Sequence, residues 1–187
     1  MTAMAERPTT VKTTAPAVRY ASAETAAQRA ARYVWAGVRL GFAWTLLWAF
    51  VDKVFGLGFA TPGERAWVNG GSPTKGFLSG AEGPFAGFYH DLAGTGFADG
   101  AFMLALLGIG SAFALGIGMR VAAVAGAVLY VMMWSVALPP QANPFLDEHL
   151  ISAAVMVGLA LVGAGRTLGL GGYWEKLPIV KAQPWLK

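Results

Sequence analysis

The chain has 187 residues, of which 56% are hydrophobic and 13% are charged, and its mean hydropathy is +0.52. These values are not those of a soluble domain and indicate an integral membrane protein. The net charge of +4 does not indicate nucleic-acid binding, because no basic run is interleaved with aromatic residues. The absence of cysteine excludes disulfides, thiolate nucleophiles, iron–sulfur clusters and most structural zinc sites on this chain.

The N-terminal 33 residues precede the apolar part of the chain and fall into two parts. Residues 1–21 are rich in Thr, Ala and Pro and have too little apolar bulk to order, so we expect a disordered cytoplasmic tail. Residues 22–33 are rich in Ala and carry Arg29 and Arg32 just before the apolar region. They predict a helix along the inner membrane surface, with Ser22 as its cap.

Four apolar segments follow, and each approaches the roughly 20 residues that a helix needs to cross the membrane. They are Val34 to about Phe55, Gly100 to Met119, Val121 to Leu138, and Asp147 or Glu148 to about Leu168. Pro139 and Pro140 end the third segment, and a glycine-rich stretch stops the fourth. The sequence therefore predicts an all-α membrane protein, with a four-helix bundle over residues 34–170 and a cytoplasmic segment over residues 171–187.

The connection between the first two spans, Gly58 to Thr95, is long for a loop and has several aromatic residues. Loops of this length usually have structure or function of their own. Ser72-Pro73-Thr74 follows two glycines and predicts a turn that caps a short helix from Thr74 to Ser79. We expect this loop to lie outside the cytoplasm.

The distribution of Lys and Arg predicts the orientation, because these residues are retained on the cytoplasmic side of membrane spans. Arg29, Arg32, Arg120 and Arg166 all fall on one side of a four-pass arrangement. The opposite side has Arg65 and Lys75 in the long first loop and no Lys or Arg in the second connection, residues 139–149. Both termini are therefore expected in the cytoplasm.

Six ionisable side chains reach the outer level of this arrangement, and they are Asp52, Lys53, Asp99, Asp147, Glu148 and His149. Such residues cap helix ends at the water interface, or they handle ligands and protons inside a bundle. Both interpretations stay open for Asp52, Lys53 and His149, whereas Glu148 and Asp99 suit the first. Arg39 lies inside the first span at its inner end.

Cofactor ligands are sparse in the sequence. A b-type haem needs two axial ligands on facing helices, and the two histidines, His90 and His149, do not provide them. Methionines on apolar helices are typical of core packing, and we expect no metal centre. Trp48 and Trp134 fit an aromatic belt, and they could also form the walls around a flat aromatic ligand.

Three stretches carry a resemblance to a known family: Arg39-Leu40-Gly41 with Trp48 and Asp52-Lys53, residues 69–78 around Ser72-Pro73-Thr74, and Asn143 to His149. The chain resembles the DoxX family of small four-helix bacterial membrane proteins from about Tyr33 to Leu170. That family includes the DoxD subunit of thiosulfate:quinone oxidoreductase. The resemblance implies a bacterial cell-membrane subunit of a quinone-linked redox assembly, with other redox subunits and membrane lipid as partners.

A quinone headgroup needs a hydrogen-bond donor, a nearby carboxylate and an apolar slot. Lys53 or His149 would be the donor, and Asp52 or Asp147 would exchange protons; we expect Lys53 and His149 to lie close together. The slot is expected between the first and fourth helices, and its cofactor-binding residues are expected to be Arg39, Trp48, Trp134, Ser72 and Thr74.

Two other classes of function compete with a quinone-site subunit. A non-catalytic accessory subunit of a membrane redox complex is the main alternative, because the sequence has no ligand for a tightly held cofactor. A transporter has less support, since the sequence shows neither an inverted repeat nor a helix broken at mid-membrane depth.

Overall fold

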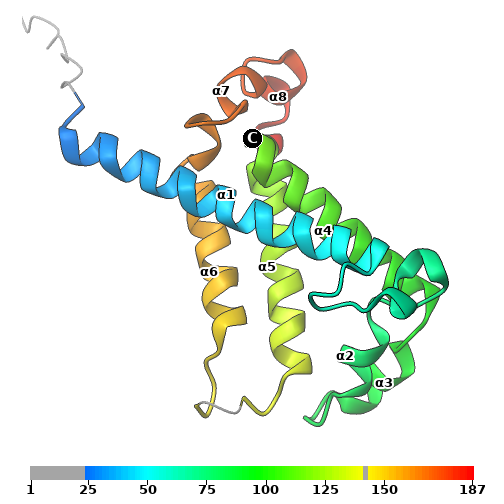
Figure 1. Ribbon diagram of the computed structural model, residues 1–187. Coiled ribbons are helices and arrows are strands. Elements are labelled where there is room, and N and C mark those ends of the chain that lie inside the picture. The colour runs from blue at the N-terminus through cyan, green and yellow to red at the C-terminus, as the bar shows by residue number, and fades with distance from the viewer. Residues whose placement is uncertain (1–23, 141–142) are drawn as a thin grey trace, which may run out of the picture.

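The computed structural model describes residues 24–140 and 143–187, and within these ranges it forms helices and no strand (Figure 1). The long helices are α1 (Ala26–Phe55), α4 (Gly96–Leu115), α5 (Met119–Val136) and α6 (Glu148–Leu161). The predicted all-α class is confirmed for this part of the chain. The predicted disordered tail and the Ser22 cap lie outside the described residues.

Three of these helices, α1, α4 and α5, are long and apolar enough to cross a membrane. The fourth, α6, is apolar but has 14 residues, which gives it a length of about 21 Å against the roughly 30 Å of a hydrocarbon core. It ends before the expected Leu168 because Gly163 adopts a left-handed conformation (φ 66°), and the short helix η3 (Ala164–Arg166) follows. Residues 24–140 and 143–187 therefore contain three helices of membrane-spanning length.

Helix α1 is one continuous helix of 30 residues, about 45 Å long. It begins at a capping box in which the Thr25 hydroxyl accepts the Gln28 N–H and the Gln28 side chain accepts the Thr25 N–H. It ends at Gly56, which is in the left-handed conformation. The surface helix expected over residues 22–33 and the span expected from Val34 are therefore parts of one helix, without a break at residue 34. The exposed first turns of α1 extend past the other long helices (Figure 1).

The long helices pack as two pairs, α1 with α4 and α5 with α6, and α4 also contacts α5. The buried core between them is apolar and is formed by residues such as Leu46, Met103, Leu106, Phe113, Met156 and Leu159. Gly126 lets α5 approach α6 closely, because a Cβ there would collide with the sulfur of Met156. Gly116 and Gly118, both in the left-handed conformation, form the tight turn from α4 to α5. Helix α4 therefore lies about four residues earlier in the chain than the sequence suggested, and α5 about two residues earlier.

The long connection between α1 and α4 contains four short helices: η1 (Gly63–Arg65), η2 (Trp67–Asn69), α2 (Lys75–Ser79) and α3 (Ala86–Leu92). The helix expected from Thr74 is α2, and it begins one residue later. Leu78 of α2 and Tyr89 of α3 pack with Val136 of α5 in a second buried cluster. Helices α2 and α3 thus cover one end of the α4–α5 pair, whereas η2 packs against α1.

The C-terminal residues form α7 (Gly171–Trp174), α8 (Pro178–Ala182) and η4 (Pro184–Leu186). They fold back against the beginning of α5, where the Arg120 N–H donates to the carbonyl of Lys187 at 2.7 Å. Figure 1 shows this segment at the opposite end of α5 from the α5–α6 connection.

Candidate functional site

An apolar pocket of about 410 Å³ lies between α4 and α5 and is bounded by the small helices α2 and α3. Phe102 on α4, Met132 on α5 and Tyr89 on α3 are among its larger lining residues. Within the part of the chain that the structure describes, a single charged side chain lines it, that of Lys53 near the end of α1. The pocket is therefore an apolar space with one cation at its edge.

The Lys53 ammonium has little to bind within the protein. Its Nζ lies 6.0 Å from the centroid of the Phe102 ring, at the outer limit of a cation–π contact. It forms no salt bridge with any residue in the ranges 24–140 and 143–187. Its hydrogen-bond donors are thus available to a ligand in the pocket.

The loop Ser72-Pro73-Thr74 forms one wall of the pocket and is held there by Asp99. The carboxylate oxygen Oδ1 of Asp99 accepts the Ser72 hydroxyl at 2.8 Å, the Thr74 hydroxyl at 2.6 Å and the Thr74 N–H at 3.0 Å. Asp99 lies in the first turn of α4, where the helix dipole favours a carboxylate. Pro73 and Thr74 line the pocket, whereas Ser72 acts through Asp99.

Asp52 secures the chain that follows α1 and does not pair with its neighbour Lys53. Its side chain is 2% exposed, and its two oxygens accept the N–H groups of Phe59 at 3.3 Å and Ala60 at 3.1 Å. Both carboxylate oxygens therefore serve the loop. Asp52 was expected to exchange protons with a ligand beside Lys53, but no contact of Asp52 with the pocket or with Lys53 supports this expectation.

Arg39 is fully buried near the middle of α1 and does not line the pocket. Its Nη1 donates to the carbonyls of Phe113 and Ala114 in the last turn of α4, and its Nη2 donates to those of Leu168 (2.8 Å) and Thr167 (3.3 Å). The carbonyl end of a helix attracts a cation. Fourteen residues separate Arg39 from Lys53, about 21 Å along α1, so Arg39 joins helix ends far from the pocket.

Asp147 and His149 form a pair at the beginning of α6. Oδ1 of Asp147 accepts the N–H groups of His149 (3.0 Å) and Leu150 (3.2 Å), and Oδ2 lies 2.7 Å from Nδ1 of His149. Burial raises the pKa of the Asp147 carboxyl. The hydrogen bonds from the His149 ring and from the Leu150 N–H lower it by more than burial raises it, so the net pKa is below the usual value. Asp147 is thus an ionised N-cap.

The ligand atoms of Asp147, Glu148 and His149 lie within 4.8 Å of one another, close enough for a metal ion to contact all three. The capping bonds of Asp147 and its contact with His149 account for this cluster without an ion. The His149 ring also lies 6.1 Å from that of Tyr130 on α5.

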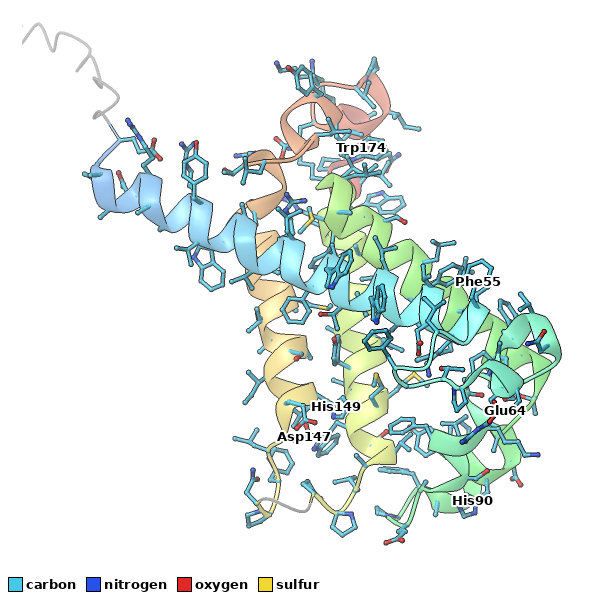
Figure 2. All side chains as sticks on the ribbon, in the orientation of Figure 1. Phe55, Glu64, His90, Asp147, His149 and Trp174 are labelled. Carbon is cyan, nitrogen blue, oxygen red and sulfur yellow. The ribbon has the colours of Figure 1, made fainter. Side chains whose placement is uncertain are left out.

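The structure does not bring the two expected halves of the site together. Lys53 lines the α4–α5 pocket, whereas His149 lies beside Tyr130 and Asp147 at the beginning of α6. Within the described residues, no hydrogen bond or ion pair joins Asp52 or Lys53 to either of them. Figure 2 shows Asp147 and His149 well apart from Phe55, which marks the end of α1 near Lys53.

The two tryptophans expected to form the walls of a slot have other partners. Trp48 stacks on Trp44 at 5.6 Å and meets Phe59 edge-on at 5.0 Å. Trp134 donates its indole N–H to the carbonyl of Phe145 at 2.9 Å. Neither lines the pocket, which lies between α4 and α5 and not between α1 and α6.

The pocket residues that sequence reasoning missed include an apolar face of α5. Ala125, Val128, Leu129, Met132 and Val136 recur at helical spacing and all line the pocket. That spacing was visible in the sequence, but in a helix that is apolar on every side it does not distinguish a pocket wall from a lipid-facing surface.

Comparison of the chain with protein-family models, with curated proteins and with solved structures gives no match. The resemblance to the DoxX family therefore stays an expectation from the sequence. The function of the chain is best inferred from the pocket beside Lys53 and from the contacts of the buried charged residues around it.

Proposed function

We propose that the chain is a membrane subunit of a quinone-linked oxidoreductase or respiratory redox assembly, and that a quinone ring binds in the pocket between α4 and α5. The observation that carries the proposal is Lys53, the one charged side chain among the described residues that lines this largely apolar pocket. A quinone has a flat apolar ring with carbonyl oxygens. It therefore needs apolar walls and a donor, and an ammonium offers three donors and no acceptor.

The pocket fits such a ring. Its volume of about 410 Å³ is within the usual range of roughly 300–1,000 Å³ for small-molecule sites. Phe102 and Tyr89 would contact the ring, and Lys53 would donate to a carbonyl oxygen. Exposed Phe97 and Val128, which also line the pocket, would contact an apolar tail. When bound, the quinone would supply the electron-accepting group, while the chain binds it, orients it and excludes water.

The proposal includes a four-pass arrangement in a bacterial cell membrane, with both termini in the cytoplasm and the long α1–α4 connection outside. Helix α6 would complete its crossing with η3 and the residues up to Leu168. The support is the charge asymmetry. Arg29, Arg32, Arg120 and Arg166 fall on the inner side, whereas the outer side has only Arg65 and Lys75 in the long connection and no Lys or Arg in residues 139–149.

Cysteine labelling tests this arrangement cleanly, because the natural chain has no cysteine. In intact cells, Ser79→Cys should react with a membrane-impermeant thiol reagent, and Lys181→Cys should react only after the cells are opened. Both positions are exposed on the protein surface, so access by the reagent reports the side of the membrane. The reverse labelling pattern would invert the arrangement.

A non-catalytic accessory subunit is the second candidate, and one observation favours it. Among residues 24–140 and 143–187, no carboxylate lines the pocket. Both oxygens of Asp52 accept backbone N–H groups, and Oδ1 of Asp99 accepts the Ser72 and Thr74 hydroxyls and the Thr74 N–H. Lys53 would then hold a quinone or lipid without a proton acceptor beside it. The partners in either case are other subunits of a membrane redox complex and membrane lipid, and no nucleic acid.

The experiment that tests quinone binding is a titration of the purified protein in detergent with a short-chain ubiquinone and with a menaquinone analogue. Removing a hydrogen bond from a charged donor costs about 1.5–3 kcal/mol, so Lys53→Met should weaken binding by about tenfold or more. Lys181→Met, at an exposed position in α8, is the matched control and should bind as the natural protein does.

A pocket-filling variant, Ala125→Phe, provides a second measurement that does not depend on charge. It should reduce quinone binding while the helix content in detergent stays unchanged. Unchanged affinity in both Lys53→Met and Ala125→Phe would remove the quinone site. Loss of a co-purifying subunit in Lys53→Met, with quinone binding intact, would favour the accessory role.

A further inference from the structure

A second, smaller cavity of about 170 Å³ lies at the end of the molecule that contains Trp174 (Figure 2). It is formed where the beginning of α5, the end of α6 and the C-terminal segment meet. Three cationic side chains line it, those of Arg120, Arg166 and Lys187, together with one carboxylate, that of Glu175.

Much of this positive charge is not used by the protein. Arg166 donates Nε and Nη2 to Glu175 at 2.9 and 2.8 Å, and Arg120 donates Nη1 to the carbonyl of Pro184 at 2.9 Å. The other N–H donors of Arg120 and Arg166, and the Lys187 ammonium, form no hydrogen bond with any residue in the described ranges. The three cations outnumber Glu175 even when an α-carboxylate at Lys187 is counted against them.

Apolar surface adjoins the charged part of the cavity. Leu161 and Val162 at the end of α6 line the same cavity and are 82% and 52% exposed. A small soluble anion would contact the cations alone. A molecule with an anionic head and apolar chains would contact both parts, with its chains along the end of α6.

We propose that this cavity binds a phosphate-bearing anion, with Arg120, Arg166 and Lys187 as its ligands. The exposed apolar residues beside it favour the headgroup of an anionic phospholipid over free phosphate. Guanidinium groups match phosphate oxygens with paired donors, and basic pockets at the ends of membrane helices bind anionic headgroups. This site is independent of the pocket beside Lys53.

The test uses native mass spectrometry of the full chain in detergent, titrated with phosphatidylglycerol and, in parallel, with phosphatidylcholine of the same acyl chains. We expect phosphatidylglycerol to be retained preferentially. The variant Arg120→Gln with Lys187→Gln should lose that preference, with affinity reduced on the order of tenfold, since each basic residue contributes measurably to anionic lipid binding. Lys187→Gln alone leaves the Arg120–Pro184 bond intact and should give a smaller loss.

The control is Lys181→Gln, which removes a positive charge from exposed α8 and does not line the cavity. Competition by millimolar inorganic phosphate would support the phosphate site and assign it to a soluble anion, whereas retention of the lipid in phosphate would assign it to the headgroup. Equal retention of the two lipids without phosphate binding, or an equal loss in Lys181→Gln, would overturn the proposal.

Discussion

Arg39 and Lys53 lie on the same helix, fourteen residues apart, yet their surroundings are opposite. Arg39 is 0% exposed, and its two terminal nitrogens donate to four backbone carbonyls from two other parts of the chain. Lys53 is partly exposed, lies over one aromatic ring and edges an apolar pocket. The two terminal nitrogens of Arg39 are paired within the protein, although its buried Nε has no partner among the described residues. The Lys53 ammonium forms no salt bridge with any described residue.

The difference in hydrogen-bond partners distinguishes a structural cation, Arg39, from a cation that is available to a ligand, Lys53. A guanidinium has five donors in a planar fork and can satisfy pairs of carbonyls on two sides, so Arg39 joins the end of α4 to residues 167–168. The donors of Lys53 are therefore available to a ligand in the pocket, whereas the terminal nitrogens of Arg39 hold the helices together.

The largest expected effect is the loss of stability in Arg39→Met. Removing the guanidinium leaves the carbonyls of the last turn of α4 without their donors, and hydrogen bonds to a charged group contribute about 1.5–3 kcal/mol each. We expect the free energy of unfolding to fall by about 3 kcal/mol or more, measured by thermal unfolding in detergent.

The matched comparison for this prediction uses Arg39→Lys and Lys53→Met. An ammonium at position 39 cannot reach both pairs of carbonyls, so Arg39→Lys should lose an intermediate amount. Lys53→Met should change stability by less than about 0.5 kcal/mol, as is usual away from buried networks. Equal losses in Arg39→Met and Lys53→Met would break the distinction between the two cations.

A smaller effect is expected from Asp99→Asn, which weakens the anchor of the pocket wall. The Asp99 carboxylate accepts three hydrogen bonds from Ser72 and Thr74, and an amide oxygen would accept them without the charge. We expect a loss of about 1–2 kcal/mol and faster amide hydrogen exchange across residues 72–79. Unchanged exchange in that segment would mean that Asp99 does not hold the loop.

The sequence predicts the helical class, the apolar segments and the short helix after Thr74, because these follow from local hydropathy, proline and glycine. Helix bounds shift where glycine adopts the left-handed conformation, as at Gly116, and the sequence alone does not say which glycine will do so. The continuity of α1 past residue 34 follows from its Thr25 capping box and good helix formers, which outweigh the change in composition.

The candidate site is less predictable because its contacts join distant segments. The sequence singles out Lys53, Ser72 and Thr74, but the structure aims both hydroxyls at Asp99, 27 and 25 residues away. The partners of Arg39 lie 74 or more residues away and are backbone carbonyls, which have no side-chain signature in a sequence. The pocket between α4 and α5 depends on such packing and not on any local pattern.

The smallest expected effect concerns Asp147, whose charge is used locally at the beginning of α6. Because its folded pKa is below the usual value, the carboxylate stabilises the protein fully above the unfolded pKa of about 3.9, and that contribution is lost as the pH falls through the folded pKa. At pH 7, Asp147→Ala should lose about 1 kcal/mol, the usual contribution of an N-cap. Asp147→Asn keeps a capping oxygen and should lose less.

The check is thermal unfolding in detergent at pH 7, 5, 4 and 3 for the natural protein and both variants. The difference between the natural protein and Asp147→Asn should shrink between pH 4 and pH 3, because protonation of Asp147 removes the charge that attracts the His149 ring. A difference that grows between pH 4 and pH 3 would mean that the protonated form of Asp147 is the one that stabilises α6.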